Sequence, residues 1–320
     1  MRTSHSDFEG QRPGEDPLVI LESSALPLNA GGVKSEICVK LAPRAWLGLI
    51  LLTICWPLNW KLPGVRTAFL FFPLWLGYIL AIDWLVQLRT GSSIWLRSRK
   101  QFLLLFVASA PVWWLFELIN WRTGNWEYLG ADVFSPFEYH LLCTICFSVV
   151  MPAVFETAEL AGSFRWLQRS AFGPRIASGP SLNVTLLLTG LSMLAALLVW
   201  PKYFYPFTWI SLVLILEPGN LWLGRQSLLA TLQRGDWRKV LSLGLGALIC
   251  GFFWELWNYY SFPKWVYHTP GADFLHIFEM PLPGYAGYIP FALELESLKN
   301  FLWLGVHQNE GTRASLSIAS

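Results

Sequence analysis

Long apolar blocks constrain the fold of this chain more than any other feature. A helix of about 20 mostly apolar residues matches the hydrocarbon thickness of a bilayer. The charged fraction is only 14%, against about a quarter in soluble domains. The sequence therefore predicts an all-α, polytopic transmembrane helix bundle. We expect about eight spans, near residues 45–60, 67–88, 101–121, 139–160, 181–200, 205–223, 239–260 and 284–305.

The placement of Lys and Arg predicts the orientation of these spans. Of the 23 such residues, 18 fall on one side of the predicted membrane and 5 on the other. Because positively charged loops stay in the cytoplasm, we expect both termini to be cytoplasmic. The expected location is the inner membrane of a bacterial cell, in a multi-pass arrangement. A net charge of +2 gives no indication of a nucleic-acid partner.

Two halves of the chain carry the same motifs in the same order. In each half Glu-Leu-x-Asn lies in a span and is followed by Trp-x-Tyr, Gly-Ala-Asp and Phe-Glu. Such a series is typical of an internal duplication. Two tandem four-span repeats would share one orientation, with a pseudo-two-fold axis along the membrane normal. We expect a disordered cytoplasmic tail at 1–44, repeats at 45–165 and 181–305, a cytoplasmic linker at 166–180 and a C-terminal cytoplasmic tail at 306–320.

Acidic residues inside the spans are the candidate functional groups. A carboxylate at the bilayer centre costs roughly 2.5–3.5 kcal/mol, so these acids should face the bundle interior, form pairs or take up a proton. Glu and Asn three positions apart share one helix face, and we expect the amide to orient the carboxyl group. The predicted acid and base are Glu255 and Glu117, oriented by Asn258 and Asn120; the second choices are Glu138, Glu279 and Glu294.

A structural interpretation of the intramembrane acids stays open. Polar groups hold membrane helices together, at about 0.6 kcal/mol per hydrogen bond. Asp83 and Glu217, at roughly matching places in the two halves, can also extend toward basic loops, for instance to Arg89 or Arg225. Cys143 and Cys146 form a CxxC in an apolar span without the further ligands of a metal site. No metal or cofactor is therefore predicted.

Aromatic residues crowd the loops after both Glu-Leu-x-Asn elements. They can form an interfacial belt or cover a cavity that takes an apolar ligand. The segment PLPGYAGYIPF, residues 281–291, brings Pro and Gly to the entry of the last span. Irregular backbone at membrane depth is tolerated where it lines a cavity, so this segment is the candidate for a broken or re-entrant element.

One segment of the first half, GNWEYLGADVFSPFEY, resembles the integral-membrane lycopene cyclases of carotenoid biosynthesis. Their Gly-x-Trp-x-Tyr/Phe and Pro-x-Glu-Glu elements are matched at Gly124, Trp126, Tyr128, Pro136 and Glu138. Tyr139 stands in place of the second Glu, and Glu279 aligns with Glu138 in the second half without the preceding Pro. Each half of the cyclases has three spans, whereas each half of this chain is predicted to have four. The resemblance implies a polyene or isoprenoid substrate and acid chemistry without a redox cofactor, and the missing second carboxylate argues against cyclisation itself.

Three classes of function fit these features. The first is an enzyme that acts on a lipid or isoprenoid small molecule in the bilayer by carboxylate acid/base chemistry. The second is a proton-coupled transporter or flippase, since intramembrane acids and duplicated halves also suit transport. The third is a non-catalytic membrane scaffold. Replacing Glu255 with Gln is expected to abolish activity in the first class and to change only stability in the third.

Overall fold

The computed structural model describes residues 42–170, 172–177 and 179–302, so the predicted tails fall outside it apart from residues 42–44. The first half of the described chain is helical with one strand. Its elements are α1 (Pro43–Lys61), η1 (Gly64–Phe69), α2 (Phe71–Thr90), α3 (Ile94–Arg97), α4 (Arg99–Thr123), β1 (Trp126–Leu129), η2 (Ala131–Val133), α5 (Pro136–Phe147), α6 (Val150–Gly162) and α7 (Arg165–Ser170).

The second half presents a closely similar order of elements. It consists of α8 (Pro180–Val199), α9 (Pro201–Phe204), η3 (Tyr205–Trp209), α10 (Ser211–Trp222), α11 (Leu228–Gln233), α12 (Arg238–Asn258), β2 (Lys264–Tyr267), β3 (His276–Ile277), β4 (Met280–Pro281), α13 (Leu282–Tyr285) and α14 (Tyr288–Phe301). In both halves a long helix is followed by a 3-10 turn, a second helix, a short helix, a long helix, a strand and two further helices.

Five helical segments are long and apolar enough to cross a membrane. They are Gly64–Thr90, Arg99–Thr123, Pro136–Gly162, Pro180–Val199 and Arg238–Asn258. The prediction of a mostly helical, membrane-type chain is confirmed. The other three predicted spans fall on α1, on η3 and α10, and on α13 and α14, which in the described residues do not have the length and apolarity of a membrane span.

Prolines interrupt the last helical segment of each half. The segment that was expected as one span at 139–160 divides into α5 and α6, and Pro152 is the third residue of α6. Residues 281–291 form β4, the four-residue α13 and the start of α14, where Pro290 again stands third. A proline has no N–H to donate to the preceding turn, so each helix starts anew just before it.

Two predicted boundaries differ from the structure. Helix α1 begins at Pro43, and Arg44, assigned to the tail, donates from its Nε to Asp83 Oδ2 at 2.8 Å. The predicted linker contains most of α7 and packs against the start of α12. Phe172 forms a β-bridge with Asp236, and the indole N–H of Trp237 donates to the Pro174 carbonyl at 3.0 Å.

The two halves meet along α6 and α12. A Cβ on Gly246 of α12 would lie 2.6 Å from the backbone nitrogen of Ala158 in α6, so only glycine permits this approach. Small residues allow membrane helices to pack backbone against backbone. Around this contact Val154, Ala247 and Leu295 are fully buried in the main hydrophobic core. The crossing therefore fixes α12, with Glu255 near its end, against the first half.

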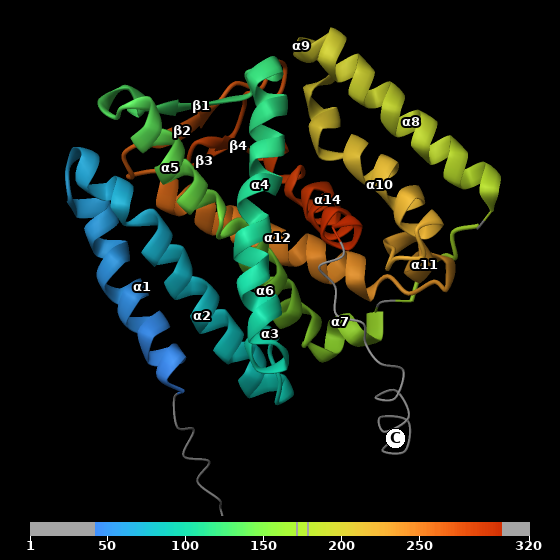
Figure 1. Ribbon diagram of the computed structural model, residues 1–320, viewed down its shortest axis with the longest axis horizontal. Coiled ribbons are helices and arrows are strands. Elements are labelled where there is room, and N and C mark those ends of the chain that lie inside the picture. Colours follow the sequence, from blue (N-terminus) through green and yellow to red (C-terminus); the bar gives the residue numbers. More distant parts are fainter. Residues whose placement is uncertain (1–41, 171, 178, 303–320) are drawn as a thin grey trace, which may run out of the picture. The chain divides into compact units, whose positions relative to one another are not determined.

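A two-stranded antiparallel sheet also joins the halves. Trp126 of β1 pairs with Tyr267 of β2, and Tyr128 pairs with Trp265. The strands lie at one end of the helices, and α3 and α7 lie at the opposite end (Figure 1). The glycines of the two Gly-Ala-Asp motifs both adopt left-handed backbone, with φ of +84° at Gly130 and +78° at Gly271, a conformation that costs glycine little. The chain after each strand thus turns at the glycine of this motif.

Candidate functional site

Glu117 of α4 is the centre of the first candidate site. Its Oε1 accepts three hydrogen bonds: from the hydroxyl of Tyr128 at 2.6 Å, the indole of Trp113 at 2.9 Å and the indole of Trp126 at 3.1 Å. Trp113 lies one helical turn before Glu117, whereas Trp126 and Tyr128 come from β1. Alternate residues of a strand point to one face, which explains why both ends of Trp-x-Tyr reach the same carboxylate.

Glu255 of α12 is the centre of the second candidate site, and it is fully buried. Its Oε1 accepts from the hydroxyls of Tyr267 at 2.6 Å and Tyr288 at 2.8 Å. The indole of Trp265 donates to the Tyr267 hydroxyl at 2.7 Å instead of to the carboxylate. Glu255 Oε2 is buried without a hydrogen-bond partner among the described residues.

The two asparagines anchor the strands and do not contact the carboxylates. The side-chain amide of Asn258 donates to the Trp265 carbonyl at 2.7 Å and accepts from the Trp265 N–H at 2.9 Å. Asn120 donates to the Trp126 carbonyl at 2.8 Å and accepts from the Trp126 N–H at 3.2 Å. The expectation that each amide orients its own glutamate is wrong, because an amide can satisfy both polar groups of a peptide unit, as a neighbouring strand would. The amides position the glutamates' donors instead.

An apolar cavity of about 150 Å³ lies between the two sites. The aromatic donors to both carboxylates line it, namely Trp113, Trp126, Tyr128, Tyr267 and Tyr288, together with Trp265, whose indole donates to Tyr267. Neither glutamate belongs to the lining, so Glu117 lies behind phenol and indole donors and Glu255 lies behind two phenol donors. The aromatics of the two strands thus form part of the cavity wall, as the cavity interpretation expects, whereas Trp121, Phe137 and Tyr260 of the same loops are exposed, as an interfacial belt requires.

Packing among aromatic rings fixes the donors in place. Trp126 stacks on Trp209 of η3 with ring centroids 5.9 Å apart, and Tyr288 stacks on Trp254, also at 5.9 Å. Burial, and next the nearby carboxylate of Glu117 or Glu255, raises the pKa of Tyr128 and of Tyr267 well above the ordinary value of 10. Both phenols therefore remain protonated donors at neutral pH.

Glu156 and Glu294, each four residues after a proline, are buried away from the cavity. Glu294 of α14 accepts at Oε1 from the Leu212 N–H of α10 at 3.1 Å, and its Oε2 has no partner in the described chain. Glu156 of α6 is fully buried, and neither of its carboxylate oxygens is hydrogen-bonded within the described residues. Glu294 therefore does not join Glu255 and Glu117 at the aromatic cavity.

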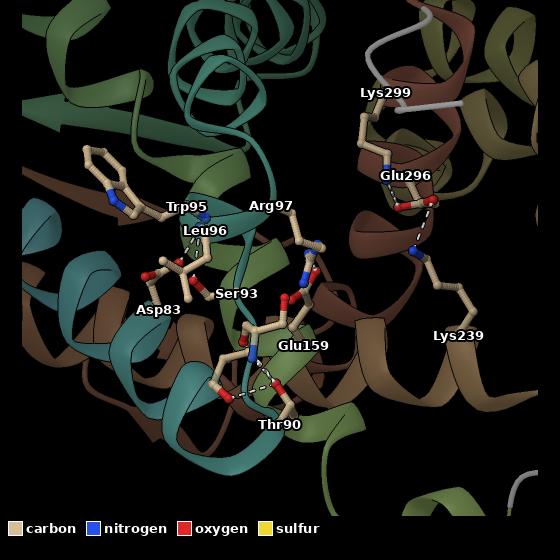
Figure 2. A network of polar contacts seen from close by, with 12 residues as sticks. Asp83, Thr90, Ser93, Trp95, Leu96, Arg97, Glu159, Lys239, Glu296 and Lys299 are labelled. Atoms are coloured by element: carbon tan, nitrogen blue, oxygen red, sulfur yellow. Dashed lines mark hydrogen bonds and ion pairs between the residues drawn. The ribbon is translucent and has the colours of Figure 1, made fainter. Parts of the chain in front are cut away.

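Asp83 and Glu217 bind the starts of short helices instead of Arg89 and Arg225. Asp83 Oδ1 accepts from the N–H of Trp95 in α3 at 3.1 Å (Figure 2). Glu217 Oε2 accepts from the N–H of Leu229 in α11 at 3.0 Å. The first N–H groups of a helix lack partners within the helix and favour an anionic acceptor. The expected contacts to these two arginines are wrong. Asp83 forms its ion pair with Arg44 instead, at 2.8 Å. Glu217 also accepts from the hydroxyls of Ser227 and Ser297, each at 2.6 Å.

The structure places Glu138 and Glu279 outside the pair of sites. Glu138 is exposed and closes a capping box on α5, accepting from the Ser135 N–H at 2.9 Å. Such a box satisfies N–H groups that a helix leaves unpaired at its start. Glu279, in the turn between β3 and β4, forms an ion pair with Lys264. Both contacts give these carboxylates roles in local structure.

The CxxC segment lies on α5, where Cys143 is buried and Cys146 half-buried as free thiols. Cys143 lines the aromatic cavity together with Cys146. No cluster of three or more metal-ligating side chains occurs in the part of the chain that the structure describes.

Comparisons with known proteins identify no relative: no protein-family model, no curated protein and no solved structure matches this chain. The geometry of the two carboxylate sites is therefore the basis of the functional argument.

Proposed function

We propose that this protein is a membrane enzyme that protonates a carbon–carbon double bond of an isoprenoid or other unsaturated lipid in the aromatic cavity. The observation that carries the proposal is that the Tyr267 and Tyr288 hydroxyls both bond to Glu255 and both line the cavity. They link a buried carboxyl group to an apolar binding space. The resemblance of the first half to lycopene cyclases supports the same substrate class.

The size and lining of the cavity support an isoprenoid end group as the bound part. A dry cavity of roughly 150 Å³ accommodates a molecule the size of benzene, and this one has about that volume. It therefore holds one ring or one isoprene unit, and the remaining hydrocarbon of a long substrate would extend into the bilayer. Indole and phenol faces stabilise a nearby cation by roughly 0.5–2 kcal/mol each, which suits a developing carbocation.

The proton would move in one balanced step. The hydroxyl proton of Tyr267 or Tyr288 passes to one carbon of the double bond while the carboxyl proton of Glu255 moves to the phenol oxygen. The carboxylate that remains then accepts both hydroxyls, which is the arrangement observed. Donors already in place around the product charge lower the barrier. Glu117, through Tyr128, would take up the proton that the carbocation loses.

A comparison of lipid extracts tests this function. Cells that make isoprenoid polyenes would carry no copy, the unaltered protein, Glu255→Gln, or the double change Tyr267→Phe and Tyr288→Phe, at matched membrane levels. We expect a lipid product that falls by about 100-fold or more in both variants, since general acid catalysis contributes that much. Glu127→Gln, at a carboxylate of β1 that is 56% exposed, is the matched control. Identical profiles in all samples would exclude the enzyme and leave the transporter and the scaffold.

A proton-coupled transporter or flippase is the second candidate function. The observation that favours it is Glu156, which is fully buried with neither oxygen hydrogen-bonded in the described residues. Ionisable groups in this state mark proton relays in membrane transporters. Proton uptake into liposomes, lost in Glu156→Gln and kept in Glu255→Gln, would support transport over catalysis.

We also propose that the chain crosses the inner membrane eight times as two tandem repeats, with both termini cytoplasmic. The repeated order of elements and the equivalent hydrogen bonds at the two sites support duplication. The excess of Lys and Arg on one side supports the orientation. Cytoplasmic fluorescence of a C-terminal fusion, together with external labelling of a cysteine placed at Leu129, tests both.

A further inference from the structure

A second cavity lies at the other end of the bundle, remote from the β-strands. It has a volume of about 370 Å³, and the proposed function makes no use of it. Its walls come from both halves of the chain. The first half contributes α3, α4, α6 and α7, and the second half contributes α12 and α14. Four cationic side chains line it, namely Arg97, Arg238, Lys239 and Lys299.

Ion pairs hold these cations around the cavity. Arg97 pairs with Glu159, and Arg238 pairs with Asp236 at 2.6 Å. Lys239 and Lys299 approach opposite oxygens of one carboxylate, Glu296, at 3.3 and 2.8 Å (Figure 2). Two lysines thus share a single acid, and the set carries one positive charge in excess.

Lys299 is a buried ammonium group at the wall of this cavity. Its side chain is 11% exposed, its Nζ donates to Glu296, and it lies 4.7 Å from the centre of the Phe155 ring. An ammonium group has three N–H donors, and Glu296 is the one ion-pair partner that the described residues supply. Burying such a group is costly unless its donors are satisfied. An anion in the cavity would supply the remaining acceptors.

Two long helices begin at the same cavity. Gln101 lies in the first turn of α4, and Arg238 is the first residue of α12; both line the cavity. The start of a helix carries a partial positive charge that favours anions. The N–H groups of Gln101 and Arg238 themselves donate to Ser98 Oγ and Asp236 Oδ1, both at 3.1 Å, so the helix starts contribute through this charge. The cavity therefore combines helix starts from both halves with guanidinium groups, which bind phosphoryl oxygens in pairs, and with lysines, which act as point charges.

We propose that this cavity binds a phosphoryl anion, held between the halves by Arg97, Lys239 and Lys299. The same chemistry is offered by a free phosphate or diphosphate and by the headgroup of an anionic phospholipid. Three segments of membrane-spanning length border the cavity: Arg99–Thr123 and Arg238–Asn258 begin there and Pro136–Gly162 ends there. The site therefore lies at a predicted membrane surface. Basic pockets between transmembrane helices bind lipid headgroups at that depth. The proposal is independent of the aromatic cavity and its chemistry.

Thermal unfolding of the full chain in nanodiscs distinguishes the two sources. One arm uses phosphatidylcholine discs with added inorganic phosphate or diphosphate, against chloride at equal ionic strength. The other arm compares phosphatidylglycerol discs with phosphatidylcholine discs. A rise in the unfolding midpoint in the first arm identifies a free anion, and a rise only in the second identifies a headgroup.

Lys239→Gln is the main variant, because its side chain is 46% exposed and Lys299 still satisfies Glu296. We expect the anion to bind this variant at least about tenfold more weakly, the effect of losing one charge-assisted contact. Lys299→Met should lose more, and Lys202→Gln on α9 is the control with unchanged binding. No midpoint shift in either arm, or equal shifts in Lys239→Gln and the unaltered protein, would overturn the proposal.

Discussion

The two carboxylate sites use the same motif and obtain their hydrogen-bond donors differently. Both receive a tyrosine hydroxyl at 2.6 Å from the adjoining strand, Tyr128 in one and Tyr267 in the other. The further donors to Glu117 are two indoles, one of them from its own helix, whereas the further donor to Glu255 is the Tyr288 hydroxyl of α14. The first site is half-buried and the second is fully buried.

A reciprocal exchange of side chains explains this difference. Gly251 precedes Glu255 by four residues, as Trp113 precedes Glu117. A Cβ on Gly251 would lie 2.4 Å from the Tyr288 ring, so the small residue makes room for the donor from the neighbouring helix. By the spacing to the matched prolines, Val150 occupies the position of Tyr288 in the first half. Each site thus keeps a large aromatic donor in this space, supplied by a different helix.

The largest effect is expected where the sites are most alike, at the strand anchors. Asn258→Ala leaves the N–H and the carbonyl of Trp265 without their partner, and each buried unpaired group costs about 1–3 kcal/mol. We expect the free energy of unfolding in detergent to fall by about 4 kcal/mol, and by a similar amount for Asn120→Ala.

Asn183→Ala on α8 is the matched control, since its side-chain oxygen accepts no hydrogen bond within the described residues. We expect a change within about 0.5 kcal/mol there. A large loss for only one of Asn120 and Asn258 would show that the two anchors are not equivalent.

The exchange of donors predicts the next largest effect. Gly251→Ala pushes a methyl group into the Tyr288 ring, and overpacking of this kind costs about 1–3 kcal/mol. The displaced phenol should also lose its bond to Glu255, which would appear as lower product formation. Gly219→Ala on α10, where among the described residues a Cβ meets only the Phe301 ring at 4.0 Å, should leave both unfolding and product unchanged.

The sequence predicted the members of the sites better than their contacts. Glu117, Glu255 and the two Trp-x-Tyr elements stand out because they recur at matched spacing. Helical spacing correctly puts Asn258 on the face of Glu255, yet the amide binds the strand. A helix pattern contains no information on which backbone groups of a later loop lack partners.

Tyr288 shows what the sequence alone could not supply. It lies 33 positions after Glu255, and a break between α13 and α14 sets its direction. The one signal was Gly251, a small residue where the first half has Trp113. The cavity likewise depends on packing between distant helices, which periodicity does not report.

Each site has a tyrosine hydroxyl from its adjoining strand, and removing it should destabilise the second site more than the first. In Tyr267→Phe the fully buried Glu255 keeps one donor and the Trp265 indole loses its acceptor. We expect a loss of about 2 kcal/mol in the free energy of unfolding. In Tyr128→Phe, Glu117 keeps two indole donors, so the loss should be about 1 kcal/mol. Equal losses in the two variants would contradict the proposed effect of burial.

The smallest effect concerns alkaline pH and tests whether both phenols are held as donors. Burial beside a carboxylate raises the pKa of Tyr128 and of Tyr267 well above 10, whereas the unfolded chain loses these protons near pH 10. The contribution of the two phenols to the free energy of unfolding is therefore complete below pH 10 and is lost as the pH rises toward their folded-state pKa values. From pH 10 to 10.5 this free energy should fall by about 1 kcal/mol for the two phenols together.

Unfolding midpoints should thus fall less steeply with pH in the double variant Tyr128→Phe and Tyr267→Phe than in the unaltered protein. Tyr203→Phe, at a side chain of α9 that is 73% exposed, should leave that slope unchanged, and the same slope in all three proteins would mean that neither carboxylate holds its phenol.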